Sequence, residues 1–400
     1  MSTQSPASVR PRVLLMATHP IQYQVPWFQA LAQQAEIDFS VLFVQLPDAR
    51  QQGVGFGVAF EWDIPLLEGY QRQPQPALAG KGGSRGFFAK RLLRPAALLR
   101  SLRPDMLILT GWQAWPLLQM LIAAKLQGVP VIMRGESNAL RQRPWAVRCL
   151  HRLLLRACQA MLTIGQGNRA FYQAYDVPDR QLFSAPYYID NARFSAAALA
   201  LAPQRAALRQ RWQIPADAAC FLFAGKLEPK KRILDLLAAL QLALRQGAPA
   251  MHLLVVGSGE QIAQAVAMVE AHRLPVTFAG FLNQTEMPAA YVVADCLVLP
   301  SDFGETWGLV VNEAMASGRP AVVSDRVGCG PDLITDGETG ALFPFGDVQA
   351  LANKLTALAA DRDSLAAMGQ RARARVEQDY SVAGAVAGTL AAVRFVAGTA

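Results

Sequence analysis

The sequence predicts an α/β protein made of two doubly wound domains, each a parallel sheet covered by helices on both faces. The chain has 400 residues, of which 52% are hydrophobic, enough for about two to three packed domains. Short runs rich in leucine and β-branched residues alternate with helical patterns along most of its length. This alternation restarts near residue 220, which indicates a second sheet.

The first domain is expected over residues 12–195, after a Ser/Pro/Gln-rich flexible leader at residues 1–11. Its first strand, at 12–18, is followed by a loop and a helical pattern. Later runs with the same strand character precede further helical patterns, at residues 37–45, 105–110, 130–134 and 159–165.

The second domain is expected over residues 196–380, with the junction in the Ala-rich and turn-like residues 191–203. Its strands are predicted at 221–224, 251–257, 276–279, 296–300 and 321–324. A final apolar helix, over 381–400, is expected to pack back on the first domain. Because ligands of such sheets bind beyond the carboxyl ends of the strands, we expect the deepest site in the cleft between the two domains.

Composition disfavours several classes of protein. The leader lacks the apolar core of a signal peptide, and the longest apolar runs fall short of the roughly 20 residues that span a bilayer, so we expect a cytoplasmic protein. Five cysteines, none at C-x-x-C spacing, are expected to be reduced. Four scattered histidines provide no zinc-ligand cluster, and no metal site is expected.

The net charge of +8 is concentrated in two segments. Residues 81–103 hold seven Lys or Arg and no acid, interleaved with Phe and Leu, and residues 141–156 combine Trp145 with five arginines. Such segments favour peripheral contact with an anionic membrane, which places the protein at the inner face of the cell membrane. The alternative is a pair of surface helices whose Arg stems cover apolar neighbours. Nucleic acid is not expected, because no binding motif accompanies the charge.

Two glutamates eight positions apart, Glu305 and Glu313, follow an apolar strand and extend into a helical pattern. Eight helical residues rise roughly 12 Å, more than the roughly 5–9.5 Å between the paired carboxylates of glycoside hydrolysis. The spacing instead suits a ligand with hydroxyl-bearing rings at both ends and an anionic middle, as in a nucleotide-sugar. The alternative is a solvated helix face.

A second candidate motif follows the first strand of the second domain, where Gly225 precedes Lys226 and Lys231. Glycine allows close backbone approach, and lysine is a point-charge ligand for phosphate, so the pair is expected to flank a diphosphate. The alternative is a helix start with solvated lysines, although cations are poorly matched to that end of the helix dipole.

The turns after the next two strands complete the expected donor site. The G-x-G turn at Gly257 lacks the third glycine of the dinucleotide fingerprint, which disfavours NAD, and no cofactor is expected. The following loop, with Gly280 and Leu282, is expected to touch a nucleobase through backbone groups.

In this order, the motifs resemble those of the retaining GT-B-fold glycosyltransferases with the E-x7-E signature, glycosyltransferase family 4. The resemblance is strongest over residues 221–347 and implies that Glu305 lies at the donor sugar, Glu313 at the nucleotide ribose, and Lys226 and Lys231 at the diphosphate. It also implies that the sugar and phosphates are lined by neighbours in the signature loop, namely Phe303, Gly304, Thr306, Trp307, Gly308 and Leu309.

The first domain departs from the family pattern. Arg134-Gly-Glu136 stands where many members carry a histidine after a strand, so the acceptor-side candidates rest on position alone. They are His19, also a candidate for the chemistry, together with Gln22, Tyr23, Arg134 and Glu136. For His19 and Glu136 the alternative is a structural hydrogen bond in a turn.

The function implied is metal-independent transfer of a sugar from a nucleoside diphosphate, UDP favoured over GDP, to a glycan or lipid-linked acceptor in cell-envelope synthesis. Within the GT-B fold, the alternatives are a sugar-nucleotide epimerase and a phosphorylase. From another class, the alternative is a non-catalytic nucleotide-sugar-binding protein that docks on membranes.

Overall fold

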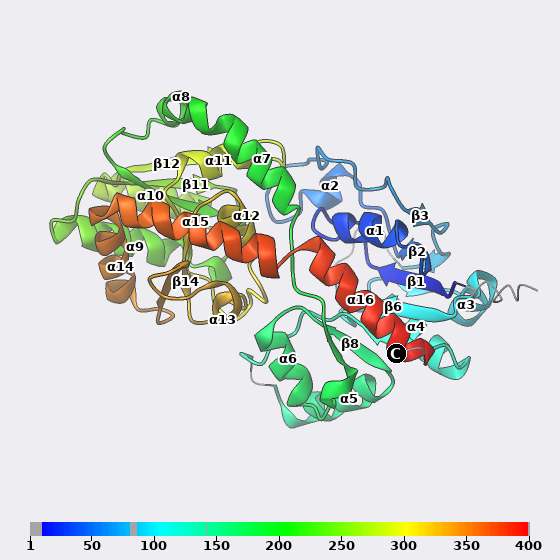
Figure 1. Ribbon diagram of the computed structural model, residues 1–400. Helices are drawn as coiled ribbons and strands as arrows, with labels where there is room; N and C mark the ends of the chain where they lie inside the picture. Colours follow the sequence, from blue (N-terminus) through cyan, green and yellow to red (C-terminus); the bar gives the residue numbers. More distant parts are fainter. Residues whose placement is uncertain (1–9, 81–85, 142, 399–400) are drawn as a thin grey trace, which may run out of the picture.

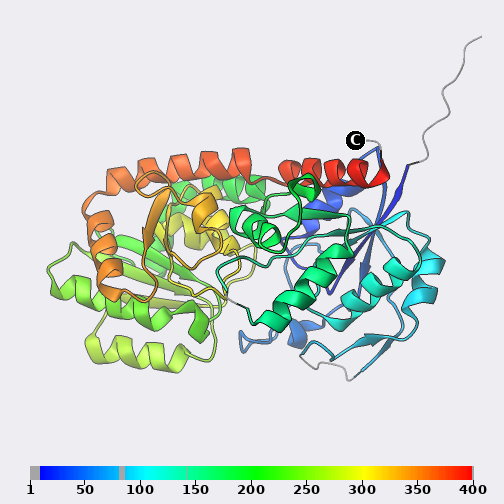
Figure 2. The same cartoon turned by 90° about the horizontal axis from the view of Figure 1, so that it is seen from below.

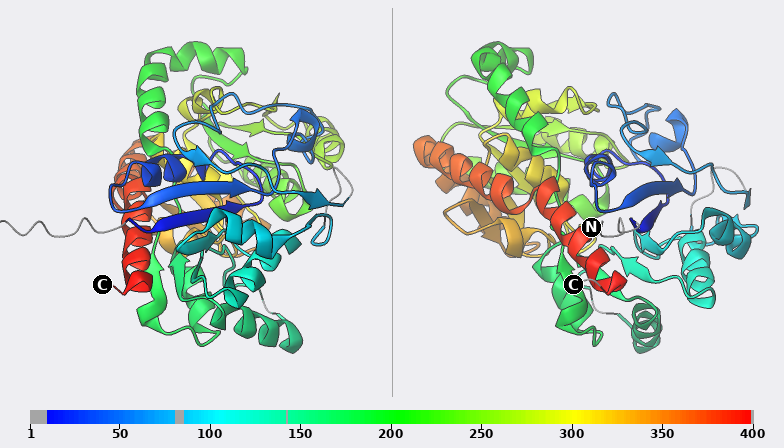
Figure 3. Two further views of the ribbon diagram at one scale, coloured as in Figure 1. Left: turned by 90° about the vertical axis from the view of Figure 1, so that its right-hand side faces the viewer. Right: turned by 45° about the vertical axis from the view of Figure 1, so that its right-hand side comes forward.

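The computed structural model describes residues 10–80, 86–141 and 143–398, and these fold into two α/β bodies side by side (Figure 1). Most of the expected leader and residues 81–85 of the first basic segment lie outside this range. Each body is built on a parallel sheet with helices on both faces, which confirms the predicted fold class. Views along the other axes show the same division (Figures 2 and 3).

The first sheet is seven-stranded within the described residues, in the order β3-β2-β1-β6-β7-β8-β9, with every neighbouring pair parallel. Its central strands are apolar at successive positions because both of their faces are covered. The strands are β1 (Arg12–Ala17), β2 (Asp38–Phe43), β3 (Gln71–Arg72), β6 (Met106–Leu109), β7 (Val131–Met133), β8 (Ala160–Thr163) and β9 (Leu182–Ser184). A separate antiparallel pair is formed by β4 (Leu78–Ala79) and β5 (Arg91–Leu92).

Two cores lie on opposite faces of this sheet. One is shared with α3 (Pro95–Leu102), α4 (Trp115–Leu126), α5 (Trp145–Arg156) and α6 (Gln166–Gln173), and the other with α1 (Val25–Ala32) and α16 (Val382–Ala397). Pro26, Pro95 and Pro116 stand in the first turns of their helices, where the missing N–H costs nothing. The short α2 (Ala49–Gln52) lies in a long connection between β2 and β3.

The second sheet has the order β12-β11-β10-β13-β14-β15 and is also parallel throughout. Its strands are β10 (Ala219–Ala224), β11 (Met251–Val256), β12 (Val276–Gly280), β13 (Cys296–Leu299), β14 (Ala321–Ser324) and β15 (Gly340–Phe343). Its helices are α7 (Asn191–Leu201), α8 (Arg205–Arg211), α9 (Ile233–Arg245), α10 (Ile262–His272), α11 (Met287–Val293), α12 (Leu309–Ala316), α13 (Gly330–Leu333), α14 (Val348–Ala360) and α15 (Arg362–Asp379). Single-turn 3-10 helices are η1 (Asp179–Gln181), η2 (Ala202–Gln204) and η3 (Pro229–Lys231).

The strand order reverses between β1 and β6 in the first sheet and between β10 and β13 in the second. At such a point the crossover helices leave to opposite faces, and a crevice opens beyond the carboxyl ends of the strands. The loops that follow β1, β10 and β13 carry the residues singled out from the sequence, so the fold gathers them at the junction of the domains.

The structure differs from the sequence expectation at the junction. Residues 191–203, which we expected to be turn-like, form α7 and part of η2, because the Asp190 side chain caps the helix by accepting from the Arg193 N–H at 3.0 Å. The proposed boundary after residue 195 therefore falls inside α7, which packs on α11 and α12 of the second domain. Strands β3, β4, β5, β9 and β15 were also not predicted.

The chain returns to the first domain at its end. After a break at 380–381, α16 packs on α1, β8 and β9, as Figure 1 shows for the red helix. Within the described residues, 362–397 is the one helical stretch that is long and apolar enough to span a membrane by composition. It is two helices, however, and the apolar side chains of α16 fill the core against α1.

Candidate functional site

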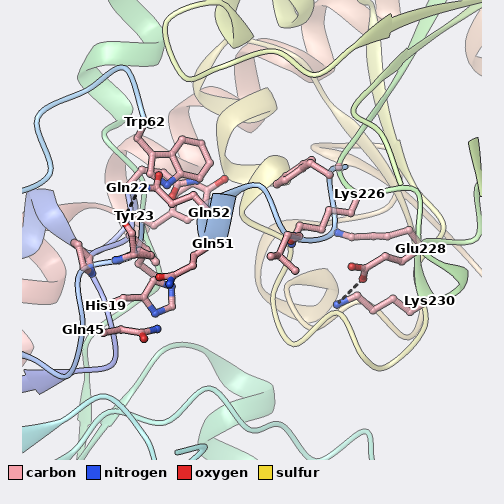
Figure 4. A pocket seen from close by; sticks show the side chains of 17 residues that line it. His19, Gln22, Tyr23, Gln45, Gln51, Gln52, Trp62, Lys226, Glu228 and Lys230 are labelled. Atoms are coloured by element: carbon pink, nitrogen blue, oxygen red, sulfur yellow. Dashed lines mark hydrogen bonds and ion pairs between the residues drawn. The ribbon is translucent and has the colours of Figure 1, made fainter. Parts of the chain in front are cut away.

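A cavity of about 550 Å³ lies between the two domains. From the first domain it is lined by the loop after β1, by the end of β2 and by α2 with the segment that follows it. From the second domain it is lined by the turn after β10 and by η3. Figure 4 shows these side chains approaching from both sides: His19, Gln22, Tyr23, Gln45, Gln51, Gln52 and Trp62 face Lys226, Glu228 and Lys230.

The turn after β10 depends on two close backbone approaches. Gly225 has φ +145° and donates its N–H to the Val256 carbonyl at 3.0 Å. A Cβ on Gly257, where φ is +122°, would stand 2.0 Å from the Gly225 carbonyl oxygen, so only glycine fits there. These contacts bring the ends of β10 and β11 together and leave the side chain of Lys231 against Gly225.

Lys231 and Glu305, both predicted to act on the donor, form an ion pair. Their side chains are 12% and 15% exposed, so the pair is largely removed from solvent while Lys231 still reaches the cavity. The Glu305 backbone is fixed on both sides: its N–H donates to the Asp302 carbonyl and its carbonyl accepts from the Gly328 N–H, each at 3.0 Å. The glutamate therefore sits in a rigid loop ahead of α12.

Lys226, the other predicted phosphate ligand, contacts the first domain. Its ammonium donates to the Val54 carbonyl at 3.0 Å and lies 4.8 Å from the centre of the Phe56 ring. An ammonium has three donors, and this contact uses one of those of Lys226. It brings the segment after α2 over the turn that follows β10.

This bridging segment, residues 53–63, was missed by the sequence reasoning. The Phe60 ring stacks on Phe281 with 4.3 Å between centroids, and the Asn283 side chain donates to the Glu61 carbonyl at 2.7 Å. Asp63 accepts from the Thr285 backbone N–H at 3.1 Å. The predicted base-contacting loop with Gly280 and Leu282 therefore has the bridging segment beside it. The aromatic residues at 56, 60 and 62 were the only available sequence signal.

The signature loop holds the remaining donor candidates in different environments. Phe303 is 43% exposed, whereas Trp307 is buried, donates its indole N–H to Asn312 at 2.8 Å and stacks on Tyr187 at 5.7 Å. Gly308 has φ +104° and begins α12, so Leu309 is the first helical residue. The neighbouring candidates are held by backbone contacts: Gly304 donates to the Asp302 side chain at 2.6 Å, and the Thr306 carbonyl accepts from Asn138 at 3.3 Å.

Glu313 does not line the cavity. Glu313 belongs to α12, and its carboxylate is buried. The carboxylate accepts from the Tyr291 hydroxyl at 2.5 Å and also interacts with the Tyr23 hydroxyl from the first domain. Burial raises the pKa of Glu313, although the hydrogen bonds from the two tyrosines oppose the shift. In this structure the tyrosine of the first domain therefore covers the carboxylate that we expected at a ribose.

The acceptor-side candidates fall into three environments. His19, Gln22 and Tyr23 line the large cavity, and burial lowers the pKa of His19, whose Nδ1 lies 3.0 Å from the Thr18 hydroxyl. Glu136 instead lines a smaller cavity of about 260 Å³ and accepts from the Tyr187 hydroxyl at 2.5 Å. This second cavity is lined by loops of both domains, with Thr110, Gly111, Trp112, Gln113, Gly135 and Ser137 from the first and Thr306 from the second.

Arg134 lies in the core beneath the cleft. Its guanidinium is 4.8 Å from the ring centre of Tyr187, 5.0 Å from that of Trp27 and 5.8 Å from that of Tyr188. Burial opposes its charge, but Tyr188, Tyr187 and Glu136 outweigh burial and raise its pKa. Arg134 is 1% exposed and lines neither cavity. It packs beneath Tyr187, Tyr188 and Glu136 and supports them from the core.

No group of three or more His, Cys, Asp or Glu side chains within the described part of the chain is arranged to hold a metal ion. The cations at the cavity, Lys226, Lys230 and Lys231, are the groups that can meet a phosphate there. Chemically, the site offers three lysines with two carboxylates, Glu228 and Glu305, beside a space large enough for a nucleotide.

Comparison with known proteins identifies the second domain. Residues 204–375 match the sequence model of the family described as glycosyl transferases group 1. A sulfoquinovosyl transferase of Arabidopsis thaliana is 44% identical over 108 residues, which are 26% of this chain and 21% of the relative. A D-inositol 3-phosphate glycosyltransferase of Nocardia farcinica is 35% identical over 177 residues, 42% of this chain and 39% of the relative. A phosphatidyl-myo-inositol mannosyltransferase of Mycobacterium leprae is 40% identical over 141 residues, 34% of this chain and 36% of the relative. In each case the match spans well under half of the relative.

Solved structures resemble the whole chain. A glycosyltransferase from Rickettsia africae has a TM-score of 0.73 at 13% identity and is matched over 98% of this chain and 100% of its own. Anabaena HepE, solved with UDP and glucose, has a TM-score of 0.70 at 17% identity, over 95% and 99% of the two chains. Both domains together therefore adopt the predicted GT-B fold, and residues 204–375 match the model of the glycosyl transferases group 1.

Proposed function

From the glycosyl transferases group 1 domain formed by residues 204–375, we propose that the chain is a retaining glycosyltransferase of family 4, the E-x7-E type. It transfers a sugar from a nucleoside diphosphate to an acceptor hydroxyl. The observation that supports this most is the Lys231–Glu305 ion pair beside the interdomain cavity, inside the domain that matches the family.

In this proposal the cations hold the donor diphosphate. Lys231 reaches the cavity beside Gly225, and Lys226 lies at the same turn, so both ammonium groups can approach one pyrophosphate. Charge-assisted hydrogen bonds of this kind are about twice as strong as neutral ones. UDP is the favoured nucleotide, because Anabaena HepE, which shares the fold, is described in complex with UDP and UDP-glucose.

Glu313 is proposed as the ligand of the ribose, a role that requires Tyr23 to leave the carboxylate. Tyr23 belongs to the first domain and Tyr291 to the second, so separation of the domains removes one hydroxyl and keeps the other. Ribose hydroxyls are then suitable donors to replace the phenol. In the structure, Tyr23 of the first domain thus stands where the proposal requires the ribose.

The chemical step is proposed to proceed with retention. The bond between the anomeric carbon and the β-phosphate oxygen breaks, and the bond to the acceptor oxygen forms on the same face, with the acceptor proton passing to the leaving phosphate. Lys226 and Lys231 stabilise the charge that develops on the leaving diphosphate, so no metal ion is invoked. Glu305 supports the sugar; a covalent intermediate on its carboxylate is the less favoured variant.

The acceptor is proposed to be a glycan or a lipid-linked molecule of the cell envelope, met in the cytoplasm. The names of the relatives support this class, since they include a phosphatidyl-myo-inositol mannosyltransferase and a sulfoquinovosyl transferase. The smaller cavity with Glu136 and Thr306, which opens between the same two domains, is the proposed acceptor side, together with His19, Gln22 and Tyr23.

A donor screen with UDP-, GDP- and ADP-sugars tests the proposal. The purified chain is assayed for nucleotide release with and without candidate acceptors, and the anomeric configuration of the product is determined. Glu305→Gln is expected to lower turnover far more than UDP affinity, whereas the exposed Glu338→Gln serves as the matched control. EDTA is expected to leave the rate unchanged.

Equal turnover by Glu305→Gln and the wild type with a confirmed donor would refute the proposed site. Formation of an isomerised sugar or sugar nucleotide without an acceptor would indicate an epimerase instead, and release of a sugar phosphate from a glycan with inorganic phosphate would indicate a phosphorylase. Binding of UDP without turnover of any donor would indicate a non-catalytic nucleotide-sugar-binding protein.

A further inference from the structure

Exposed apolar side chains are concentrated on one part of the first domain. Eight of the fourteen exposed large hydrophobic residues in the described part of the chain lie between residues 88 and 153, about one sixth of the sequence. They are Phe88, Leu93, Ile122, Leu126, Trp145, Val147, Leu150 and Leu153, and three of them, Phe88, Leu126 and Trp145, are at least 74% exposed. Such a concentration marks an interaction site rather than scattered surface residues.

These residues occupy the outer sides of neighbouring elements. Helices α3, α4 and α5 share the core on one face of the first sheet, and α3 packs against α4. Phe88 lies 5.6 Å from Trp115 at the start of α4, and Trp112, just before α4, lies 5.2 Å from His151 of α5. The segment 86–94 and helices α3, α4 and α5 are therefore neighbours on one side of the first sheet, and we call their exposed side the basic apolar face. The course of these helices can be followed in Figure 2.

Helix α5 shows why this face is incompletely packed. Of its twelve residues, only His151 and Leu155 are buried, while Trp145, Leu150 and Leu153 project from the protein. A helix with so few buried residues gains little stability from packing against the core. Its apolar outer side therefore requires another explanation.

The charge of this surface is predominantly positive. From residue 86 to residue 156 the chain contains only two acids, Asp105 and Glu136. Asp105 pairs with Arg12, and Glu136 lines the smaller cavity, so neither neutralises the outer helices. Cations of these elements include Lys90, Arg91, Arg94, Arg100, Arg103, Lys125, Arg141, Arg148, Arg152 and Arg156, of which Arg152 pairs with Asp176 at 2.9 Å.

We propose that the basic apolar face docks on an anionic lipid bilayer, with Trp145, Leu153 and Leu126 entering the headgroup region and the surrounding cations meeting lipid phosphates. Exposed Trp and Leu among Lys and Arg is the composition of interfacial helices. A second copy of the chain is the less suitable occupant, because two such faces would oppose like charges. Anionic headgroups complement the face.

Docking in this way also places the smaller cavity close to lipid. The cavity is lined by Gly135, Glu136 and Ser137, which precede α5 in the sequence, and Trp112 of the cavity wall contacts His151 of that helix. An acceptor carried by the bilayer would therefore reach the cleft alongside α5. This last step rests on the proposed function, whereas docking itself does not.

Flotation of the full chain with vesicles tests the proposal. Neutral phosphatidylcholine vesicles are compared with vesicles containing about 30% phosphatidylglycerol, at low and high salt. Binding is expected only with the anionic vesicles, and it should weaken as salt rises because exposed charges are screened. Trp145→Ser with Leu153→Ser is expected to lower the bound fraction at both salt concentrations; Leu199→Ser, an equally exposed apolar site on α7, should not.

The charge is tested separately with Arg148→Glu and Arg156→Glu. One cation near an anionic surface contributes about fivefold to partitioning, so the double reversal should lower it at least tenfold. The matched reversal of two exposed cations of the second domain, Arg245→Glu and Arg273→Glu, should have a much smaller effect. UDP affinity, measured on every variant, should equal that of the wild type and shows that the donor domain is folded.

Failure of the wild type to float with anionic vesicles at low salt would overturn the proposal. So would a concentration-dependent dimer in light scattering that Trp145→Ser and Leu153→Ser abolish while vesicle binding is absent, because the face would then join two copies. Failure of the wild type to bind UDP would instead count against the proposed function, and docking would then be judged by flotation alone.

Discussion

Replacement of Lys231 by methionine removes one ammonium and keeps most of the apolar stem. The ammonium reaches the interdomain cavity and pairs with Glu305, and both side chains are largely shielded from solvent. If Lys231 holds a donor phosphate, Lys231→Met removes a hydrogen bond to a charged group, which is worth about 1.5–3 kcal/mol.

The lost contact is partly offset, because the phosphate competes with Glu305 for the same ammonium. Taking about 0.5 kcal/mol for an ion pair that keeps some solvent contact, the net loss is about 1–2.5 kcal/mol. At 1.4 kcal/mol per tenfold, the Kd for UDP should rise about 5- to 60-fold. The same balance predicts that Glu305→Gln, which frees the ammonium, leaves UDP binding unchanged or about twofold tighter.

Isothermal titration with UDP measures both effects, and Lys354→Met is the matched control. Lys354 carries the same charge, pairs with Asp336 at 3.0 Å and lies on α14, away from either cavity. A Kd for Lys231→Met within twofold of the wild-type value would refute the reasoning. So would equal weakening by Lys231→Met and Lys354→Met, since the effect would then reflect net charge alone.

Three further outcomes are expected. Gly257→Ala should lower the Tm by about 2–12 °C, because overpacking costs about 1–3 kcal/mol; Gly247→Ala, with φ +80° and open space around its Cβ, should cost less, and equal shifts would argue against the clash. Burial lowers the pKa of His252 to about 4. Between pH 6.5 and pH 4 the unfolded chain therefore takes up a proton that the folded chain does not, so the free energy of unfolding decreases as the pH falls over this range. His252→Gln should therefore flatten the fall of Tm over that range, and parallel curves would contradict it. Thr389→Val leaves the buried Trp27 N–H without its acceptor at 3.2 Å and should lower the Tm by about 2–12 °C, from a loss of about 1–3 kcal/mol; an unchanged Tm would show that α16 contributes little there.

The fold was predictable where strands are long and apolar on both faces, as at Met106–Leu109 and Cys296–Leu299. It was not predictable where a strand is very short, as for β3 and β9, because two or three residues are too few to show the alternation of a strand. The helix at 191–201 was missed because Ala-rich sequence is equally compatible with a linker until the capping Asp190 is seen.

The proximity of Lys231 and Glu305 was predictable because each lies in a loop that follows a strand of the second sheet, and the fold brings them into contact across 74 residues of sequence. Their action on a donor stays a prediction. The burial of Glu313 was not predictable, because it depends on Tyr23, nearly three hundred positions away in the other domain. The bridging segment 53–63 lies in a connection without regular structure, where neither helix nor strand periodicity marks its residues.

The chain passes between its domains at two neighbouring points, residues 185–190 and the break at 380–381, and the Asn191 side chain donates to the carbonyls of Val376 and Tyr380 at 2.9 and 3.1 Å. These hydrogen bonds hold the two connections together on one side of the junction. The bridging segment lies on the opposite side of the junction (Figure 2). The Lys226–Val54 and Phe60–Phe281 contacts therefore join the two domains on the side where no chain connection does, and a separation of the domains on that side has to break both.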